Sequence, residues 1–374
     1  MKQFVIIIVL ALACIGSDAQ KVIYLFIGTY TDGKPAKGIY VYRMNMQTGE
    51  LTATGTAENV TNPSFLTVSA NGKYLYACTD TKTAVAGSIS AFSVDSIKGR
   101  INFINKESSE GANPVYVAAD KTNRLVIAGN YTEGNVAVLP TNQNGSLRTA
   151  IQTIQFTDSS VNKDRQDKAH IHSVIFSPDD GYLYLPDLGA DKIRAFRFNK
   201  ANKQPLETAD PLTISTAKGS GPRHMVFHPN KKFAYCIGEM GGSVSVYSYN
   251  KGLLSPLQRI NANKIKAAEY SSADIHISPD GLFLYASNRI ENTVAIFSIN
   301  AYGKLRLLGH EATGGEVPRN FCIDPDGRFL LVANQSSNTV VVFKRNAKSG
   351  LLTPANIQIT VPAPSCLQMR TYRQ

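Results

Sequence analysis

Tryptophan is absent from the 374 residues, and cysteine is scarce, with five in all. The lack of tryptophan excludes repeat families that carry a Trp-Asp signature in every copy. The formal net charge is +11, but the basic residues are scattered, without the long lysine and arginine run of a nucleic-acid-binding arm, so no nucleic-acid partner is expected. We interpret the excess positive charge as general surface character with a modest bias toward anionic ligands.

The apolar segment near the N-terminus is also short. Its apolar run, residues 4–13, falls below the ~20 residues that span a bilayer, so no membrane span is expected. Lys2 before the run and Ser17 and Ala19 after it are typical of a secretory signal peptide over residues 1–19. We expect a periplasmic or secreted protein. A lipoprotein attached through Cys14 is the alternative, disfavoured because leucine is not at the usual position before that cysteine.

What the chain does contain is one pattern repeated seven times: a strand, a Pro-Asp-Gly type turn, a second strand, a polar tip, a third strand and a turn such as Gly-x-Leu. Successive copies are 50, 51, 57, 51, 50 and 46 residues apart. The anchors on the second strands are Phe26, Tyr76, Ile127, Tyr184, Tyr235, Tyr285 and Leu331. A period of this length built from short strands predicts an all-β, seven-bladed β-propeller.

The two ends of the repeat are incomplete in a complementary way. The first copy begins at its second strand, residues 22–30, whereas residues 364–369 at the other end have no partner strand. We therefore expect the C-terminal strand to pair in the first blade and close the ring, which removes exposed sheet edges. Residues 20–374 are then a single domain, expected to be a monomer. The longest irregular stretch, residues 157–169, is interpreted as a surface insertion.

The cysteines that remain after removal of the signal are even in number but fall on strands of different blades. They are Cys78, Cys236, Cys322 and Cys366. Buried free thiols are expected rather than disulfides.

Candidate site residues are found at positions where the seven copies of the repeat carry different residue types. The loops at one face of a propeller converge on a single concavity, a common place for ligands. Twelve residues before each anchor, at the entry to the inner strand, the chain has Ser64, Val115, His172, Arg223, Ala273 and Arg319, with Ser365 in the closing strand. Four residues after each anchor, at the tip, it has Tyr30, Asp80, Tyr131, Leu188, Glu239, Arg289 and Gln335. Both rings are expected to face the same mouth.

Three arginines and one glutamate in these rings, Arg223, Arg289, Arg319 and Glu239, predict an anion site, because a guanidinium is a planar fork suited to carboxylate or phosphate. His172 and Glu239 are the groups there that can move a proton near neutral pH. Solvated surface residues at loop tips are the alternative for Glu239 and Arg289.

Other histidines remain open alternatives. His170 is two residues from His172 and shares its strand face, so either could be the site histidine. His224, His228 and His276 suit structural roles, although His224 is also a substrate-binding candidate with His170, Arg319 and Gln335. No Asp/Glu pair joins the two histidines in register, so neither a metal nor a cofactor is expected.

Several segments, among them Gly221-Pro222-Arg223-His224 and Ser287-Asn288-Arg289, resemble the seven-bladed lactonase family. That family includes the propeller type of 6-phosphogluconolactonase and the fungal carboxy-muconate cyclase. The resemblance to the cyclases implies site roles for His172, Arg223, Glu239 and Arg289 at the channel mouth, and the lactonase branch implies a sugar lactone phosphate as ligand.

The sequence therefore predicts an exported, metal-independent lactonase for an anionic sugar lactone. In this hypothesis arginines bind the anion and stabilise the oxyanion, and His172 or Glu239 is the general base for water. No nucleophile elbow is visible, which favours direct water attack. A glycan- or protein-binding propeller and a muconate-type cycloisomerase are the alternatives.

Overall fold

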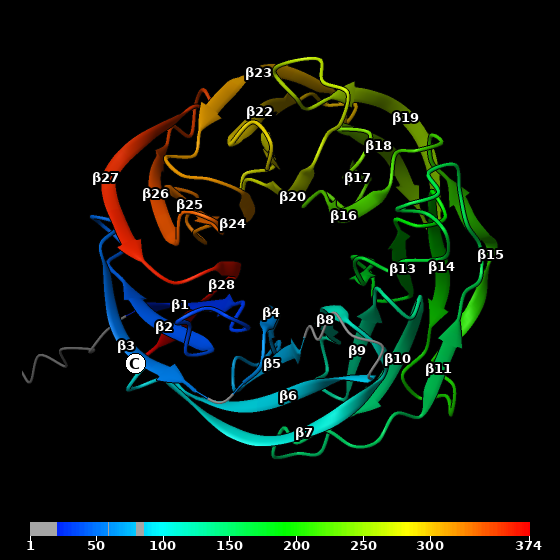
Figure 1. The fold of residues 1–374 in the computed structure, drawn as a ribbon, viewed down its shortest axis with the longest axis horizontal. Helices are drawn as coiled ribbons and strands as arrows, with labels where there is room; N and C mark the ends of the chain where they lie inside the picture. Colours follow the sequence, from blue (N-terminus) through cyan, green and yellow to red (C-terminus); the bar gives the residue numbers. More distant parts are fainter. Residues whose placement is uncertain (1–20, 59, 80–85) are drawn as a thin grey trace, which may run out of the picture.

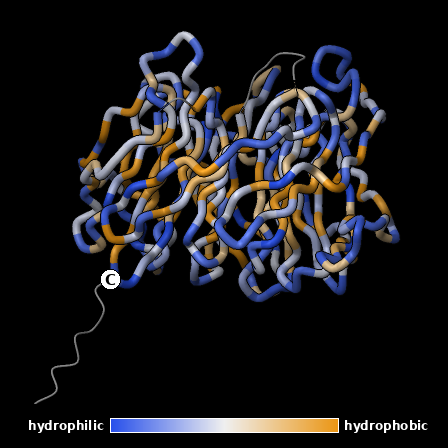
Figure 2. The backbone as a smooth tube through the Cα atoms, turned by 90° about the horizontal axis from the view of Figure 1, so that it is seen from below, coloured by the Kyte–Doolittle hydropathy of each residue, from blue (hydrophilic) through white to orange (hydrophobic). Residues whose placement is uncertain are grey.

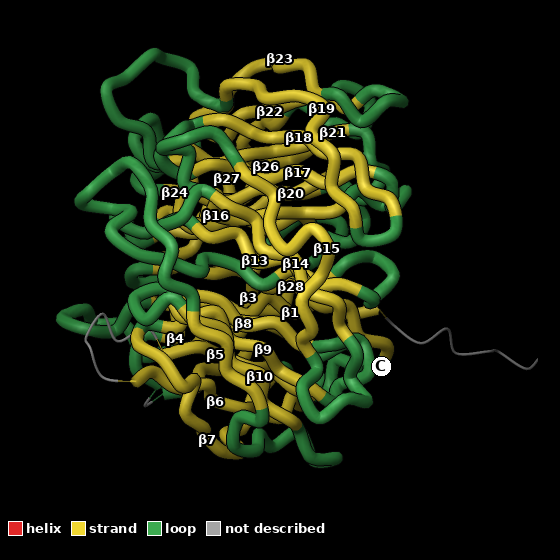
Figure 3. Tube along the Cα trace, turned by 90° about the vertical axis from the view of Figure 1, so that its right-hand side faces the viewer, coloured by secondary structure: helices red, strands yellow, loops and turns green. Residues whose placement is uncertain are grey.

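The computed structural model describes residues 21–58, 60–79 and 86–374. The predicted signal peptide and Asp80 lie outside this part of the chain. Within it, 28 strands form seven four-stranded antiparallel sheets arranged in a ring around a central axis (Figure 1). Strands and loops make up the described part, without helices (Figure 3), and accordingly no helix there is long and apolar enough to cross a membrane. The prediction of an all-β, seven-bladed propeller is confirmed.

The strands of each blade run from the axis outward, and every predicted anchor lies on the second strand of its blade. Blade one has β28 (Pro364–Arg373), β1 (Lys21–Thr29), β2 (Ile39–Met44) and β3 (Leu51–Ala57). Blade two has β4 (Pro63–Val68), β5 (Tyr74–Thr79), β6 (Ala86–Asp95) and β7 (Arg100–Ala112). Blade three has β8 (Pro114–Ala119), β9 (Leu125–Asn130), β10 (Asn135–Pro140) and β11 (Gln152–Gln155).

The other four blades follow the same order. Blade four has β12 (Ile175–Phe176), β13 (Tyr182–Asp187), β14 (Lys192–Phe198) and β15 (Leu206–Ser215). Blade five has β16 (Pro222–Phe227), β17 (Phe233–Gly238), β18 (Ser243–Asn250) and β19 (Leu253–Asn261). Blade six has β20 (Ser272–Ile277), β21 (Phe283–Asn288), β22 (Thr293–Ile299) and β23 (Leu305–Ala312). Blade seven has β24 (Pro318–Ile323), β25 (Phe329–Asn334), β26 (Thr339–Arg345) and β27 (Leu352–Thr360).

The ring closes as the sequence predicts. Strand β28 pairs antiparallel with β1, from Lys21 opposite Arg373 to Gly28 opposite Cys366, so the red C-terminal strand lies beside the blue first strand in Figure 1. Cys366 and Leu367 on β28 are almost fully buried. The C-terminal strand is therefore the inner strand of the first blade.

The hydrophobic core lies between neighbouring blades. One cluster, for example, joins Tyr235 and Val246 of blade five to Ala286 and Phe297 of blade six. Hydrophobic residues colour many segments along the strands orange in the backbone tube of Figure 2, while the loops at the two faces are mostly hydrophilic. Cys78, Cys236, Cys322 and Cys366 are buried and free, which confirms the expected thiols.

At four of the interfaces between blades, the turn that ends a repeat is hydrogen-bonded to the preceding blade. Tyr184 in blade four donates its hydroxyl to the carbonyl of Gly252 in blade five, at 2.6 Å. A Cβ at Gly252 would lie 2.2 Å from the ring of Tyr182, and Gly252 has a φ of 92°, so only glycine suits the turn. The equivalent hydroxyl bonds are Tyr76 to Gly145, Tyr235 to Gly303 and Tyr285 to Gly350. The repeated tyrosine and glycine are thus parts of one inter-blade contact.

The inner strands enter the sheet through β-bulges. On β16 the register shifts between Pro222 and His224, which leaves Arg223 without a partner on β17. The same shift passes over Ser64, Val115, Ala273, Arg319 and Ser365 on their strands. A bulge re-aims the side chain of the extra residue. The entry ring predicted from the sequence is therefore largely a ring of bulge residues.

Candidate active site

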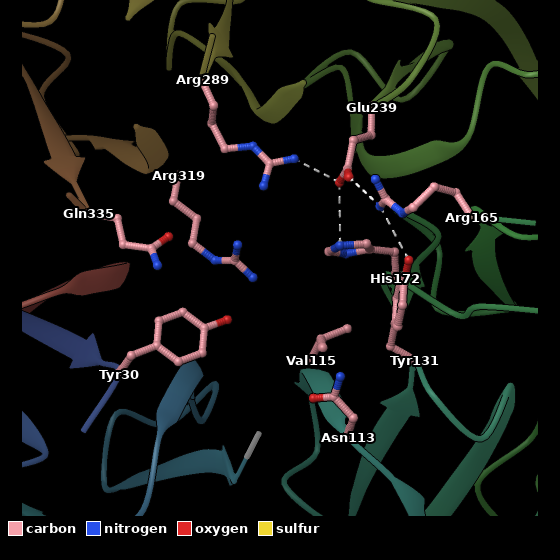
Figure 4. Close-up of a pocket in the computed structure, with 10 residues that line it drawn as sticks. All are labelled: Tyr30, Asn113, Val115, Tyr131, Arg165, His172, Glu239, Arg289, Arg319 and Gln335. Atoms are coloured by element: carbon pink, nitrogen blue, oxygen red, sulfur yellow. Dashed lines mark hydrogen bonds and ion pairs between the residues drawn. The ribbon is translucent and has the colours of Figure 1, made fainter. Parts of the chain in front are cut away.

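A cavity of about 210 Å³ opens at the mouth of the ring. Residues of both predicted rings line it, which brings the entry positions and the tip positions together as expected. Its lining residues are Tyr30, Asn113, Val115, Tyr131, Arg165, His172, Glu239, Arg289, Arg319 and Gln335 (Figure 4). Five of the eight candidate site residues are among them.

Glu239, directly after β17, is the centre of the charged cluster. Its Oε2 accepts from Arg223 Nε and from Arg289 Nη2, each at 2.9 Å. Its Oε1 accepts from Arg165 Nη2 at 2.7 Å. Burial opposes ionisation of Glu239, but the charges of Arg289 and Arg223 prevail and hold its pKa well below the usual range. Glu239 is therefore an ionised anchor for guanidinium groups and a weak base.

Arg223 lies behind the cavity wall, and only 2% of the residue is exposed. Its Nη1 donates to the carbonyl of Ala273 at 2.6 Å and to His224 Nε2 at 3.1 Å. Burial and the nearby charge of Arg289 lower the pKa of Arg223 to about 9, so the group stays charged at neutral pH. Arg223 thus supports Glu239 from below.

His172 stands beside this cluster. Blade four has a short inner strand, and the backbone N–H of His172 donates to the carbonyl of Pro186 at 3.0 Å. Its Nε2 lies 3.8 Å from Glu239 Oε2, and its buried Nδ1 has no hydrogen-bond partner among the described residues. Burial, followed by the charge of Arg223, holds the pKa of His172 well below the usual range. The imidazole is therefore neutral at pH 7, with a ring nitrogen available to accept a proton.

The opposite side of the cavity carries Arg319, Gln335 and Tyr30. Arg319 places its guanidinium carbon 5.1 Å from the centre of the Tyr30 ring, within the range of a cation–π contact. Its guanidinium points toward the middle of the cavity in Figure 4, with Gln335 alongside. These residues face His172 and Glu239 across the open space.

Arg165 is the main residue that the sequence reasoning missed. It belongs to the insertion 157–169, which is largely exposed as expected, yet its guanidinium contacts Glu239. The buried Gln166 fixes the insertion here, since its Nε2 donates to the carbonyl of Leu188 at 2.9 Å. Arg165 occupies no position of the repeat, so a search by repeat register could not find it. Asn113 was missed for a different reason: it lies just before Pro114 in the repeat, at a position outside the two rings that were considered.

His170 and His224, both substrate-binding candidates, lie behind the cavity lining. His170 stacks on Tyr131 with ring centres 4.4 Å apart, and its Nδ1 is 2.8 Å from the Tyr131 carbonyl. His224 is buried against Asp274, with Nδ1 2.7 Å from Asp274 Oδ1. In residues 21–58, 60–79 and 86–374, no three His, Cys, Asp or Glu side chains group as metal ligands do.

Known proteins resemble the chain along most of its length. Residues 24–369 match the family described as "Lactonase, 7-bladed beta-propeller". A 6-phosphogluconolactonase of Formosa agariphila is 43% identical, over 93% of this chain and 99% of that protein. A 6-phosphogluconolactonase of Bacillus subtilis is 30% identical, over 92% and 97%.

A solved structure gives the same result. The periplasmic gluconolactonase of Pseudomonas aeruginosa superposes with a TM-score of 0.88 and 34% identity, over 93% of this chain and 99% of that one. This chain therefore matches known lactonases in fold, in length and in sequence. The chain belongs to the seven-bladed β-propeller lactonase family, a family of carboxylic ester hydrolases.

Proposed function

We propose that this lactonase hydrolyses an anionic sugar lactone, with 6-phosphogluconolactone as the leading candidate, by direct attack of water without a metal. The observation that carries the proposal is the charge at the cavity. The guanidinium groups of Arg165, Arg223 and Arg289 contact one carboxylate, that of Glu239, and Arg319 adds a fourth positive charge from the other side of the cavity. Such an excess of positive charge favours an anionic ligand.

The arginines divide into two groups by position. Arg223 and Arg289 are held on Glu239, and Arg289 Nε also donates to the Ser271 carbonyl at 3.2 Å. Arg319 reaches the cavity from the other side. A lactone between the two sides would place its phosphate or acid group on Arg319, with Arg165 at the rim, and would leave Arg289 for the carbonyl oxygen. The cavity of about 210 Å³ favours a single-ring substrate, since pockets for drug-sized ligands measure about 300–1,000 Å³.

His172 is the better general base of the two candidates. Glu239 is engaged by three arginines, so protonating it would break favourable ion pairs. A water molecule can fit within hydrogen-bond distance of both His172 Nε2 and Glu239 Oε2, because these atoms are 3.8 Å apart. His172 would take the proton as this water attacks the lactone carbonyl, and Glu239 would stabilise the imidazolium that forms.

The same attack places negative charge on the carbonyl oxygen. A guanidinium already fixed in position stabilises such an oxyanion without reorganising during the reaction. Arg289 suits this role, since its Nη2 bond to Glu239 and its Nε bond to Ser271 hold it at the cavity wall. Ring opening then needs one proton for the leaving hydroxyl, which the His172 imidazolium can return.

We also propose that the protein is exported. Residues 1–19 carry the pattern of a signal peptide. A structural relative at 34% identity is described as periplasmic. A lactonase outside the cytoplasm would act on lactones formed or released there.

The test is to assay a panel of lactones with and without phosphate, and to measure the rate at which hydrolysis of each lactone releases acid. We expect the wild type to prefer 6-phosphogluconolactone over gluconolactone. R289A should lower kcat/KM on the phosphorylated lactone about 10- to 100-fold, because a charge-assisted hydrogen bond contributes about 1.5–3 kcal/mol. The matched control is R306A, an exposed arginine on the outer strand β23.

EDTA should leave the rate unchanged. Loss of activity with EDTA would contradict the metal-free mechanism. No hydrolysis of any lactone by the wild type would contradict the proposed function, and an R289A enzyme equal to R306A would remove Arg289 from the site.

A further inference from the structure

A polar chain continues from the candidate active site along the axis of the ring, buried from Arg223 to Asp274 and ending at His276, whose side chain is 37% exposed. Arg223 and His224 lie on β16, and Asp274 and His276 lie on β20. Arg223 Nη1 contacts His224 Nε2, His224 Nδ1 contacts Asp274 Oδ1, and Asp274 Oδ2 contacts His276 Nε2 at 2.9 Å. None of Asp274, His276 or His224 lines the cavity, so the proposed chemistry leaves this chain unused.

Asp274 is an ionised acceptor. Only 4% of its side chain is exposed, and Asn320 Nδ2 also donates to its Oδ2 at 2.5 Å. Burial opposes ionisation, but His276 and His224 hold the pKa of Asp274 well below the usual range. An ionised carboxylate can only accept hydrogen bonds. Both histidines must therefore donate to it, His224 through Nδ1–H and His276 through Nε2–H.

Arg223 fixes the other side of His224. A guanidinium has donors and no acceptor, so its contact at 3.1 Å requires a lone pair on His224 Nε2. Donation from Nδ1 and acceptance at Nε2 define one neutral tautomer of His224. Burial and the charge of Arg223 lower the pKa of His224 to about 4, in agreement with a neutral ring.

Strand β20 holds Arg223 both directly and through His224. The carbonyl of Ala273 accepts from Arg223 Nη1 at 2.6 Å, and the next residue, Asp274, holds His224. The register of β20 shifts between Ser272 and Ile275, so both contacts come from the bulge. The guanidinium is thereby held so that its Nε reaches Glu239.

We propose that Asp274 and His224 form a positioning pair, in which Asp274 selects the His224 tautomer that accepts from Arg223 and so holds Arg223 on Glu239. The pair touches no substrate and acts through Arg223. The expected effect on turnover rests on the proposed function. The tautomer of His224 does not depend on it.

The first experiment reads the tautomer without any substrate. In ¹⁵N-histidine-labelled wild-type protein, NMR should show His224 as neutral with the proton on Nδ1. D274A should move that proton to Nε2 and break the Arg223 contact there, because the acceptor at Nδ1 is gone. A D274A ring that keeps its proton on Nδ1 would show that Arg223, and not Asp274, selects the tautomer, and would overturn the proposal. A wild-type ring protonated on Nε2, or one that is charged at pH 7, would overturn the proposal.

The second experiment uses side chains that keep or lose the acceptor. H224Q can accept from Arg223 and donate to Asp274 through one amide, whereas H224L can do neither. We expect H224L to lower kcat/KM about 10- to 100-fold and H224Q to recover most of the loss. H228Q is the control, since His228 bonds the Gly281 carbonyl, away from the cavity.

A cycle with R223A separates positioning from general stability. If the pair acts through Arg223, H224L should have little further effect in the R223A background. Equal losses in both backgrounds, or equal activity of H224L and H224Q, would contradict the proposal. If the wild type hydrolyses no lactone, the proposed function fails, while the NMR result still decides the tautomer.

Discussion

At the residue scale, Glu239 and His172 face one cavity 3.8 Å apart, and their surroundings give them different properties. Glu239 is neutralised by three arginines, whereas His172 is buried beside Arg223 and kept neutral. An ionised carboxylate and a neutral imidazole can therefore coexist at one pH. Glu239 stays ionised because of its arginine partners, and His172 stays neutral because it is buried.

The first prediction concerns these two groups. H172A should lower kcat on the best lactone by ~10²–10⁴-fold, the usual contribution of a general base. The rate needs neutral His172, whose pKa lies well below 6.5, so kcat/KM should stay level as pH falls to 6.5 and decline only at lower pH. A pH–rate profile tests this. A fall that begins above pH 6.5, or full activity in H172A, would contradict the assignment.

E239Q separates the anchor from the base. Glutamine keeps the shape but leaves Arg165, Arg223 and Arg289 without their carboxylate, so KM and kcat should both change, while the acid limb of the profile remains that of His172. An E239Q enzyme with wild-type parameters would show that the carboxylate is dispensable.

The repeat register predicted which residues line the cavity better than it predicted their properties. Counting from Tyr235 places Glu239 at a tip, and counting from Leu331 places Arg319 at an entry, because each blade repeats the same geometry. Arg165 could not be reached in this way, since it lies in an insertion that no other copy has. The low pKa of Glu239 depends on that arginine as well as on Arg223 and Arg289.

At the scale of elements, the inner strands define the site. Each predicted entry residue outside blade four is passed over in the pairing register. The sequence indicates these places by a proline before most of them, such as Pro222 and Pro318. It does not reveal that β12 is reduced to Ile175–Phe176, because residues 172–176 are apolar enough to suit a full strand.

Strand β28 provides the prediction at this scale. Deleting residues 364–374 removes the inner strand of blade one and uncovers β1, whose residues from Val22 to Thr29 are buried. We expect aggregation or a large fall in the melting temperature. Deleting only residues 371–374 keeps Cys366 and Leu367 in place and should cost much less. A soluble, monomeric and equally heat-stable protein after the longer deletion would contradict closure by β28.

At the scale of the whole molecule, stability is spread around the ring. Hydrophobic clusters join every pair of neighbouring blades, and the tyrosine-to-glycine bonds recur at four of the interfaces. The centre is different, because buried ionisable groups gather there. We therefore expect the loss of stability at low pH to depend strongly on the buried ionisable residues near the central axis.

His224 gives a measurable case. Its pKa falls from 6.5 to about 4 on folding, so the unfolded chain binds a proton more readily, and stability is lost as pH falls from 6.5 toward 4. The loss from this group is about 3 kcal/mol at 1.36 kcal/mol per pKa unit. His172 acts in the same direction, whereas His276 acts in the opposite one because its pKa is raised.

Denaturant unfolding of the wild type and H224Q at pH 7.5 and pH 4 tests this. The variant has no ionisable group at position 224, so its free energy of unfolding should fall by about 3 kcal/mol less between the two pH values. Equal losses in both proteins would show that His224 is not held neutral.

The pairing of β28 with β1 has a consequence for biosynthesis. Translation produces β1 among the first described strands and β28 as the last of them, more than 330 positions later. While the nascent chain emerges, the first blade has an unpaired inner edge, and Phe26 and Ile27 lack their neighbours Gln368 and Leu367. The ring can therefore be completed only after residues 364–373 have left the ribosome. Every residue that lines the cavity, from Tyr30 to Gln335, is thus made before the strand that closes the ring around it.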